Sequence, residues 1–398
     1  LLGGKSGKTA RNQQKSNQLA SWLYAEARAF LVERLGQQAA TEIPLLQEFA
    51  RRKLPRHRER LRRQLAKQLT DPTDLHALET AIYATTQRSS RTSETNLQRI
   101  SDLLDRNFVR QKLRQACLMQ SHENVFRTGY DTGLLPAVLT YVATGDLLAD
   151  PTIGVYFHAL RFLENPEAAT DFATFQGLLP ELPAWLATDE RRDLYLLGIN
   201  FCIRRSNRGD GAMAQEALRL YREGLNNGSL LENGRLTAFT YRNAVALSLK
   251  VRDFAWAEDF IEAYATYLPR EQRENLVHYN RARLAYARGN AEGALEELRF
   301  VRSPDTLFTL TLDTLRAKIY YETNALDLLE SHLDKMRIFL RRKGKSYHHQ
   351  NYANFIAFLS RTLHLPPGPK SRRPLRKAVA DEPFLTERQW LLEKLDAD

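Results

Sequence analysis

The sequence predicts an all-α protein, and three observations lead to that prediction. Nearly every segment of the 398-residue chain repeats its apolar residues with the period of a helix. Alternating β-branched runs bounded by hairpin turns are absent from the sequence. Breakers such as Asn165-Pro166 and Gly289-Asn290 recur along the chain. Because they fall roughly every 15–20 residues, we expect short helices that pair antiparallel with their neighbours.

Composition narrows the class of protein. Hydrophobic residues make up 43% of the chain and charged residues 26%, as in proteins that form a core. No apolar run approaches the ~18 residues of a membrane span, so we expect none. The net charge of +11 is uneven, because residues 1–70 carry 15 Lys and Arg against 5 acidic residues and residues 341–380 carry 10 against none. Two basic ends therefore flank a mildly acidic middle.

The basic N-terminal helical region is expected over residues 1–115. Its first helix has an apolar stripe that Gly36 ends, made of Leu19, Trp22, Leu23, Phe30, Leu31 and Leu35. Pro55 opens a second helix with the stripe Leu54, Leu61, Leu65 and Leu69. A helix follows over residues 75–86, and another begins near Asn96. The core-facing stripe of that last helix is expected to be Leu97, Ile100, Leu104, Phe108 and Leu113.

An internal repeat occupies the middle of the chain. The segments YRNAVALSLKVRDFAWAEDFIEAYATYLP and HYNRARLAYARGNAEGALEELRFVRSP superpose with Asn243 on Asn280 and Ala257 on Ala294, and both shifts equal 37 residues. A looser unit precedes this pair and another follows it. Small residues at such positions let two helices cross closely and let the chain turn between them.

These units resemble the tetratricopeptide repeat, a helix-turn-helix unit of about 34 residues. Gly289 lies at the turn, Asn324 takes its place in the next unit, and Ala282 and Ala294 lie at the helix crossing. The resemblance covers residues 195–345 best and implies a right-handed α-solenoid of antiparallel helix pairs. In segments such as NLQRISDLLDRNFVRQKLRQAC and WLLEKL, the whole chain is similar to an uncharacterised bacterial family of tetratricopeptide-like proteins. That similarity implies a scaffold role and no particular reaction.

The resemblance sets the expected domain limits. Tetratricopeptide-like repeats should occupy residues 116–365. Residues 366–398 should form a Pro-rich, basic linker, which contains PPGPKSRRPLRK, followed by a C-terminal helix. That helix must bury Trp390, either by capping the array or by engaging a partner. We expect the cap.

A peptide-binding groove is one candidate site. In tetratricopeptide arrays the first helix of each pair lines a concave groove, and an Asn there often faces an extended peptide. A carboxamide can pair with both the N–H and the C=O of a peptide unit. The candidate ladder is Asn200, Asn243 and Asn280. These side chains could instead hydrogen-bond within the repeat.

Polyanion binding by the basic ends is the alternative. The candidates are Arg51, Arg52, Lys53, Arg56, Arg58, Arg62, Arg63, Lys67, Arg341, Arg342, Lys343 and Lys345. The leucine stripe after Pro55 leaves the arginines on the wet face of that helix, so a solvated surface is the competing interpretation. No aromatic residues are interleaved to stack on bases.

Catalysis is not expected. The sequence lacks His-Glu-x-x-His, Gly-x-Ser-x-Gly and paired-Cys motifs, and its histidines are scattered, so we expect no metal. Gly7-Lys8-Thr9 imitates the end of a phosphate-binding loop, but the first glycine of that motif is replaced by Leu2, so we expect no cofactor. Cys117 and Cys202 are too few for a disulfide framework, which favours a reducing, cytoplasmic setting.

We therefore expect a non-catalytic scaffold that binds a protein or peptide segment. The runner-up is a nucleic-acid-binding helical protein that uses its basic ends, whose binding should depend strongly on salt. A third alternative is an enzyme whose chemistry lies in a segment before Leu1.

Overall fold

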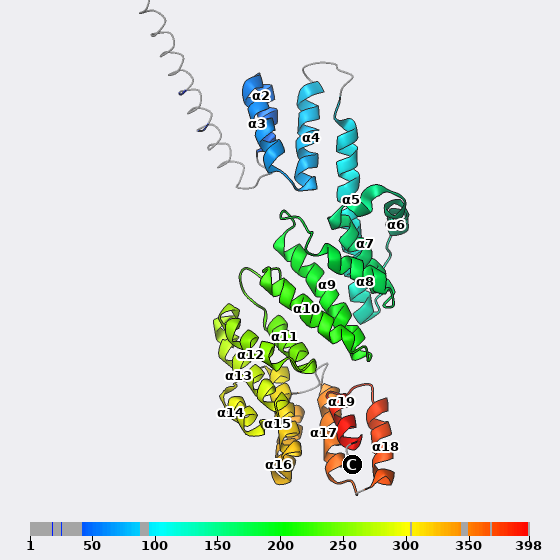
Figure 1. Cartoon of the computed structure of the whole chain (residues 1–398), viewed down its shortest axis with the longest axis vertical. Helices are drawn as coiled ribbons and strands as arrows, with labels where there is room; N and C mark the ends of the chain where they lie inside the picture. The colour runs from blue at the N-terminus through cyan, green and yellow to red at the C-terminus, as the bar shows by residue number, and fades with distance from the viewer. Residues whose placement is uncertain are drawn as a thin grey trace, which may run out of the picture. The chain divides into compact units, whose positions relative to one another are not determined.

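The structure, a computed structural model, describes residues 42–87, 95–302, 305–343, 349–366 and 368–396, together with residues 18 and 25. Over these residues it contains 18 α-helices, two short 3-10 helices and no strand, which confirms the all-α prediction (Figure 1). The helix predicted between Leu19 and Leu35 and the Gly7-Lys8-Thr9 segment lie outside the described residues, apart from positions 18 and 25.

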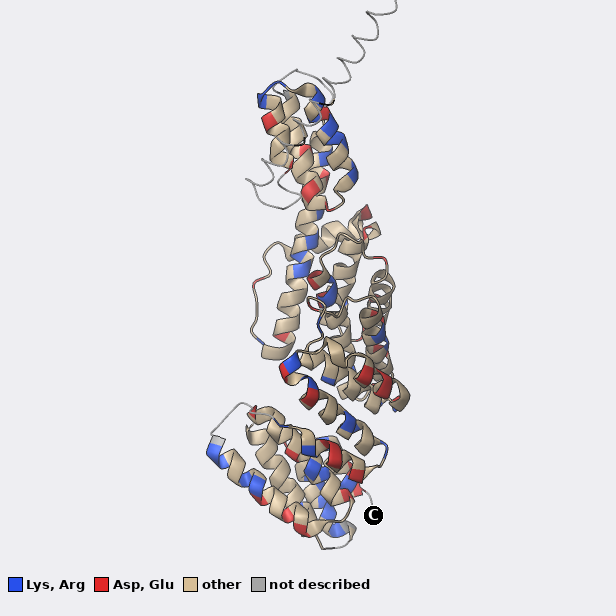
Figure 2. Ribbon diagram, turned by 90° about the vertical axis from the view of Figure 1, so that its left-hand side faces the viewer, with Lys and Arg blue, Asp and Glu red and all other residues tan. Residues whose placement is uncertain are grey.

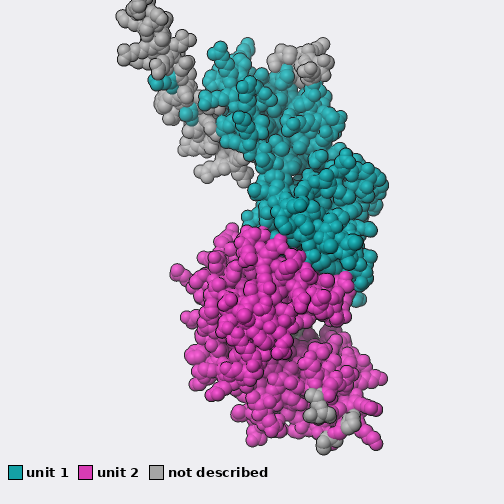
Figure 3. All heavy atoms as spheres, viewed as in Figure 1, with its two compact units in different colours: residues 1–201 teal, residues 202–398 magenta. Residues whose placement is uncertain are grey.

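The chain divides into two compact units, Leu1–Phe201 and Cys202–Asp398 (Figure 3). The division falls inside helix α9, Thr188–Asn207. Neither expected boundary coincides with it. The boundary expected after residue 115 lies inside α5, a continuous helix from Leu97 to Phe126.

Unit 1 is built from three packed helices followed by a longer helical stretch. Its elements before α9 are α2 (Ile43–Arg51), α3 (Pro55–Gln68), α4 (Pro72–Gln87), α5, α6 (Leu135–Thr144), η2 (Asp146–Ala149), α7 (Pro151–Glu164) and α8 (Ala169–Leu178). Helices α2, α3 and α4 lie side by side around a leucine core (Figure 1). The expected stripe of α3 is part of that core, since Leu61 and Leu65 are fully buried. Helix α5 packs against α4, α6 and α7.

Unit 2 is a succession of helices, each packed on the next. Its elements after α9 are α10 (Ala212–Asn226), α11 (Ala238–Lys250), α12 (Phe254–Ala263), η3 (Ala265–Tyr267), α13 (Arg270–Ala287), α14 (Ala291–Phe300), α15 (Thr306–Glu322), α16 (Leu326–Lys343), α17 (His349–Leu363), α18 (Pro369–Asp381) and α19 (Arg388–Asp396). Alternate helices also touch, because α13 packs against both α11 and α15.

One turn is repeated between the paired helices of unit 2. A residue with positive φ follows each first helix: Gly209 at 106°, Arg252 at 62°, Gly289 at 80° and Asn324 at 55°. In all four turns the next backbone N–H donates to the carbonyl five residues earlier, which caps the helix. The alanines aligned at the crossings, Ala257, Ala282, Ala294 and Ala317, are fully buried. The backbone thus repeats in the register read from the sequence.

The prediction of a linker that begins at residue 366 is wrong, because most of this segment forms helix α18. Pro369 begins this helix, and Pro374 lies inside it and removes one backbone donor. The helix forms nonetheless because Leu375 and Val379 are almost completely buried against α17 and α19. Burial of apolar side chains here outweighs the poor helix propensity of proline.

The C-terminal helix docks on α15 through Trp390. Its side chain is buried, and the indole Nε1 donates to Glu322 Oε1 at 2.8 Å. Lys394 donates to the same carboxylate at 2.5 Å, and the Lys318 ammonium lies 5.5 Å from the centroid of the Trp390 ring. Trp390 is therefore used within unit 2.

We predict that Glu322→Gln destabilises the protein in a pH-dependent manner. Burial acts to raise the pKa of Glu322, but hydrogen bonds from Lys394, Trp390 and Tyr286 outweigh it and hold the pKa below the ordinary value of 4.5. A depressed folded-state pKa stabilises the protein above the unfolded-state pKa, and this stabilisation is lost as the pH falls through the folded value. The free energy of unfolding should fall by about 1–3 kcal/mol at neutral pH.

Urea unfolding of both proteins at neutral pH and near pH 3 measures this difference. The difference in the free energy of unfolding between the wild type and Glu322→Gln should disappear near pH 3. Glu274→Gln, at an exposed position on α13, is the control and should show no gap at either pH. A gap of equal size at both pH values would contradict the role given to the carboxylate.

Candidate interaction surfaces

The structure does not assemble the expected asparagine ladder. Asn280 is completely buried; its Nδ2 donates to a backbone carbonyl of its own helix at 2.9 Å, and its Oδ1 accepts from Arg283 at 3.3 Å. The role expected for Asn280 is wrong, since a buried carboxamide cannot face an external peptide. Asn243 is half-buried and hydrogen-bonds the hydroxyl of Tyr221. Asn200 alone is exposed, and it belongs to unit 1.

The basic candidates near the N-terminus lie on α2, on α3 and in the turn between them. Six of them are exposed: Arg51, Arg52, Lys53, Arg56, Arg63 and Lys67. Glu48 pairs with Arg51 and Arg52, and Glu59 pairs with Arg62 and Arg63. Arg58 points to the core side, where it donates to the Thr85 carbonyl at 3.4 Å.

The second basic group lies in unit 2, at the end of α16. Arg341 and Arg342 are exposed there. The side chain of Lys343 and the whole of Lys345 lie outside the described residues. The two basic groups therefore belong to different units.

Helix α5 is rotated away from the orientation that its apolar stripe predicts. Leu97, Leu104 and Phe108 were expected in the core, but they are 49%, 53% and 44% exposed. Of the predicted stripe, Ile100 is half-buried and Leu113 alone is fully buried. The prediction of this helix's inner face is therefore wrong.

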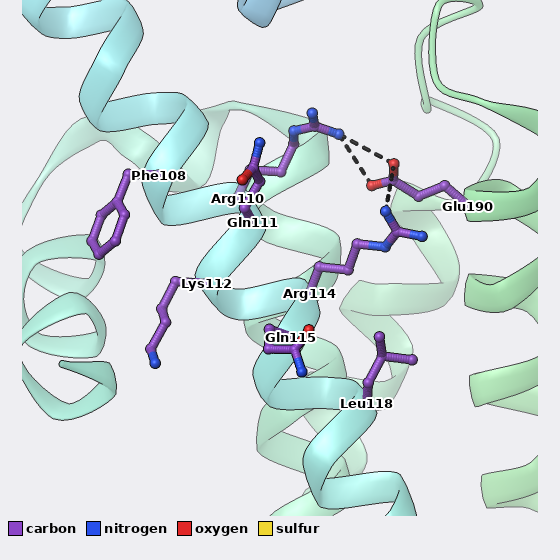
Figure 4. Close-up of a pocket in the computed structure, with 8 residues that line it drawn as sticks. All are labelled: Phe108, Arg110, Gln111, Lys112, Arg114, Gln115, Leu118 and Glu190. Carbon is purple, nitrogen blue, oxygen red and sulfur yellow. Dashed lines mark hydrogen bonds and ion pairs between the residues drawn. The ribbon is translucent and has the colours of Figure 1, made fainter. Parts of the chain in front are cut away.

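A polar cluster occupies the inner face of α5 instead. Arg110 is only 8% exposed, and its guanidinium donates to both carboxylate oxygens of Glu190 at 3.1 and 3.3 Å (Figure 4). The Tyr156 hydroxyl donates to the same carboxylate at 2.8 Å. Arg114, one turn further along α5, approaches Glu190 at 3.5 Å (Figure 4). Charged groups buried in this way must be paired, because each loses its hydration.

This cluster holds the rotation of α5. Turning the helix to bury Leu104 would carry Arg110 outward and leave the Glu190 carboxylate in the interior without its cation. The Arg110 guanidinium also lies 5.2 Å from the ring centroid of Trp185, which supports it on the other side. Burial and the Glu190 charge raise the pKa of Tyr156, so its hydroxyl remains a donor. No sequence motif marked these residues; the polar positions Asn107, Arg110 and Asn124, which share one helix face, were the available signal.

The outer face of α5 follows a coiled-coil pattern. Nine residues alternate in steps of four and three, and all nine are exposed. We call them the α5 seam; they are Leu97, Ser101, Leu104, Phe108, Gln111, Gln115, Leu118, His122 and Val125. The seam extends for about 42 Å at the helical rise of about 1.5 Å per residue. Five of its members are large and apolar, and surfaces of monomers rarely gather such residues in one row.

A groove follows the middle of the seam. It has a volume of about 580 Å³ and is lined by Phe108, Arg110, Gln111, Lys112, Arg114, Gln115, Leu118 and Glu190. Figure 4 shows Phe108 and Lys112 on one side of α5 and the two arginines on the other. The groove thus joins apolar seam residues to the edge of the ion-pair cluster.

Within the described part of the chain there is no cluster of metal-ligating side chains and no activated thiol. No three His, Cys, Asp or Glu residues there are grouped so as to hold a metal ion. Burial raises the pKa of the Cys117 thiol and raises that of Cys202 to about 12, which makes both thiols poor nucleophiles. None of the described helices combines the length and apolar character needed to cross a membrane.

Comparison with known proteins adds no relative to this picture. No protein-family model matches the chain, and neither a curated protein nor a solved structure shows significant similarity to it.

We predict that Glu190→Ala destabilises unit 1 by about 3–5 kcal/mol, because it leaves Arg110 buried without an anion. The double variant Arg110→Leu/Glu190→Leu should lose less, since no uncompensated charge remains. Urea unfolding of the two variants and the wild type measures both effects. Equal losses of unfolding free energy in the two variants would show that the unpaired charge is not what destabilises Glu190→Ala.

Proposed function

We propose that this protein is a non-catalytic scaffold that binds an amphipathic helix of a partner protein along the α5 seam. The observation that carries the proposal is the exposure of all nine seam positions on a 30-residue helix. Exposed apolar residues at this spacing are buried in other proteins by a second helix, whose side chains fit between them. The proposal keeps the binding role expected from the sequence but moves it from the asparagine ladder to α5.

The residues of the seam also indicate which features the partner helix should have. Gln111 and Gln115 lie at its centre, between the apolar residues Phe108 and Leu118. A polar residue at a core position lowers the stability of a coiled coil but fixes its register. The partner helix should therefore repeat apolar residues every three and four positions and carry a polar residue near its middle.

Unit 2 serves in this proposal as the rigid part of the scaffold. We propose that its helix pairs form a right-handed α-solenoid of the tetratricopeptide type. The repeated turn and the buried alanines at equivalent positions support this arrangement. A reducing, cytoplasmic setting is also part of the proposal and is supported by two free thiols, both of which are buried.

We predict that Leu104→Glu/Leu118→Glu abolishes partner binding without destabilising the fold. Both leucines are exposed, so the free energy of unfolding should change by no more than about 0.5 kcal/mol. The two introduced carboxylates would lose hydration on binding, which is costly. A photo-reactive phenylalanine analogue at Phe108 should crosslink one discrete protein in cells that express the native chain, and the double variant should remove that product.

The control pair is Leu326→Glu/Leu328→Glu, which changes two exposed leucines of α16 in the same way. It should leave the crosslink intact, and the analogue at exposed Phe300 should not produce it. Sequencing the crosslinked peptide should reveal a segment with heptad spacing. An identical product from Phe300, or a product that survives the seam charges, would refute the proposal.

A further inference from the structure

Helix α3 presents a row of positive charge that the α5 seam does not use. Arg56, Arg60, Arg63 and Lys67 follow one another in steps of four, three and four residues, so they share one helix face. All four are exposed, and exposed Lys53 lies just before the helix. Figure 2 shows α3 as a run of basic residues. We call these five residues the α3 stripe; Arg60 was not among the candidates taken from the sequence.

Two carboxylates pair with basic residues of this region. Glu59 is the only acidic residue of α3, and its carboxylate accepts from Arg62 through both oxygens at 2.7 and 2.8 Å. It also accepts from Arg63 at 2.8 Å, which orients that side chain along the helix surface. On α2, Glu48 pairs with Arg51 and Arg52 in the same way. Glu48 and Glu59 thus pair with Arg51, Arg52 and Arg62 outside the stripe and with Arg63 within it. Helix α3 still retains a net positive charge, with six Arg and Lys against one Glu.

The stripe has the geometry of a phosphate-binding surface. Its helical members span about 17 Å, which corresponds to about five phosphates at the 3.4 Å rise of one duplex strand. Guanidinium groups bind phosphate oxygens with two parallel hydrogen bonds, and three of the five residues are arginines.

Two features of α3 indicate that the stripe would bind neither single-stranded nucleic acid nor a membrane surface. The only ring on α3 is that of His57, which is half-buried and packs 5.9 Å from Phe49, so the stripe offers no platform for stacking unpaired bases. The leucines of α3 that could enter a bilayer, Leu61 and Leu65, are buried in the core of unit 1. A helix that binds membranes needs an exposed apolar face beside its charges.

We propose that the α3 stripe binds the phosphate backbone of double-stranded nucleic acid without reading its sequence. Backbone contacts of this kind position a protein on a duplex and carry no base information. The inference is independent of partner binding at α5, because it rests on different residues.

The test measures binding of the full chain to a labelled DNA duplex of about 20 base pairs over a range of salt concentrations. Release of counter-ions by four or five phosphate contacts predicts a log–log slope of about −4, with the same affinity for duplexes of unrelated sequence. In Arg56→Gln/Arg60→Gln/Lys67→Gln the slope should shrink by about 2.7, and affinity near 100 mM salt should fall on the order of 100-fold. Arg56→Lys/Arg60→Lys keeps the charge and should keep most of the slope.

Arg208→Gln/Arg270→Gln/Lys335→Gln is the matched control, because it removes two arginines and one lysine that are exposed in unit 2. It should bind within about twofold of the wild type if the stripe and not net charge is responsible. Equal losses in both triple variants would overturn the proposal, as would a stripe variant that binds like the wild type. Tighter binding to phosphatidylserine vesicles or to a poly-glutamate peptide than to the duplex would overturn it in favour of a membrane or an acidic protein.

Discussion

The buried ion pair between Arg110 and Glu190 is the constraint on which the arrangement of unit 1 depends. An arginine that is 8% exposed must keep its anion, and the Tyr156 hydroxyl completes the hydrogen bonds of that carboxylate. Two further contacts on this face of α5 favour the same rotation of the helix. The side chains of Cys117 and Asn124 both donate to backbone carbonyls of α7. These polar contacts decide which side of α5 faces the core. The apolar side is consequently left at the surface.

Exposing apolar residues does nothing for the stability of the chain alone, and this is why we propose a binding role for the α5 seam. The α5 seam and the α3 stripe are both in unit 1, but they would bind their partners through different interactions. The seam would bind by burying apolar area in a fixed register, whereas the stripe would bind by charge and lose affinity as salt is raised. Unit 2 contributes regular helix pairs, and its last helix is held to α15 by the Glu322 carboxylate.

Local patterns in the sequence were enough to predict helices, turns and the repeat register. Gly289 and Asn324 were aligned from the sequence, and both adopt the left-handed conformation at equivalent turns. Features that depend on distant residues were not predictable in this way. Helix α18 forms despite Pro374 because its apolar face is buried by helices before and after it. Asn280 is turned inward by a hydrogen bond that no spacing reveals, and the orientation of α5 depends on Glu190, 80 positions from Arg110.

The most direct test of the account is thiol reactivity on the two faces of α5. Both native cysteines are buried, so the wild type should react slowly with a water-soluble maleimide. Leu104→Cys places a thiol in the seam, and Ala116→Cys places one on the inner face, where the native side chain is 4% exposed. In dilute native protein the account predicts that the thiol at position 104 reacts at least about 100-fold faster than the thiol at 116. Protection at 104 with rapid reaction at 116 would show that α5 buries its apolar face, and would contradict the account.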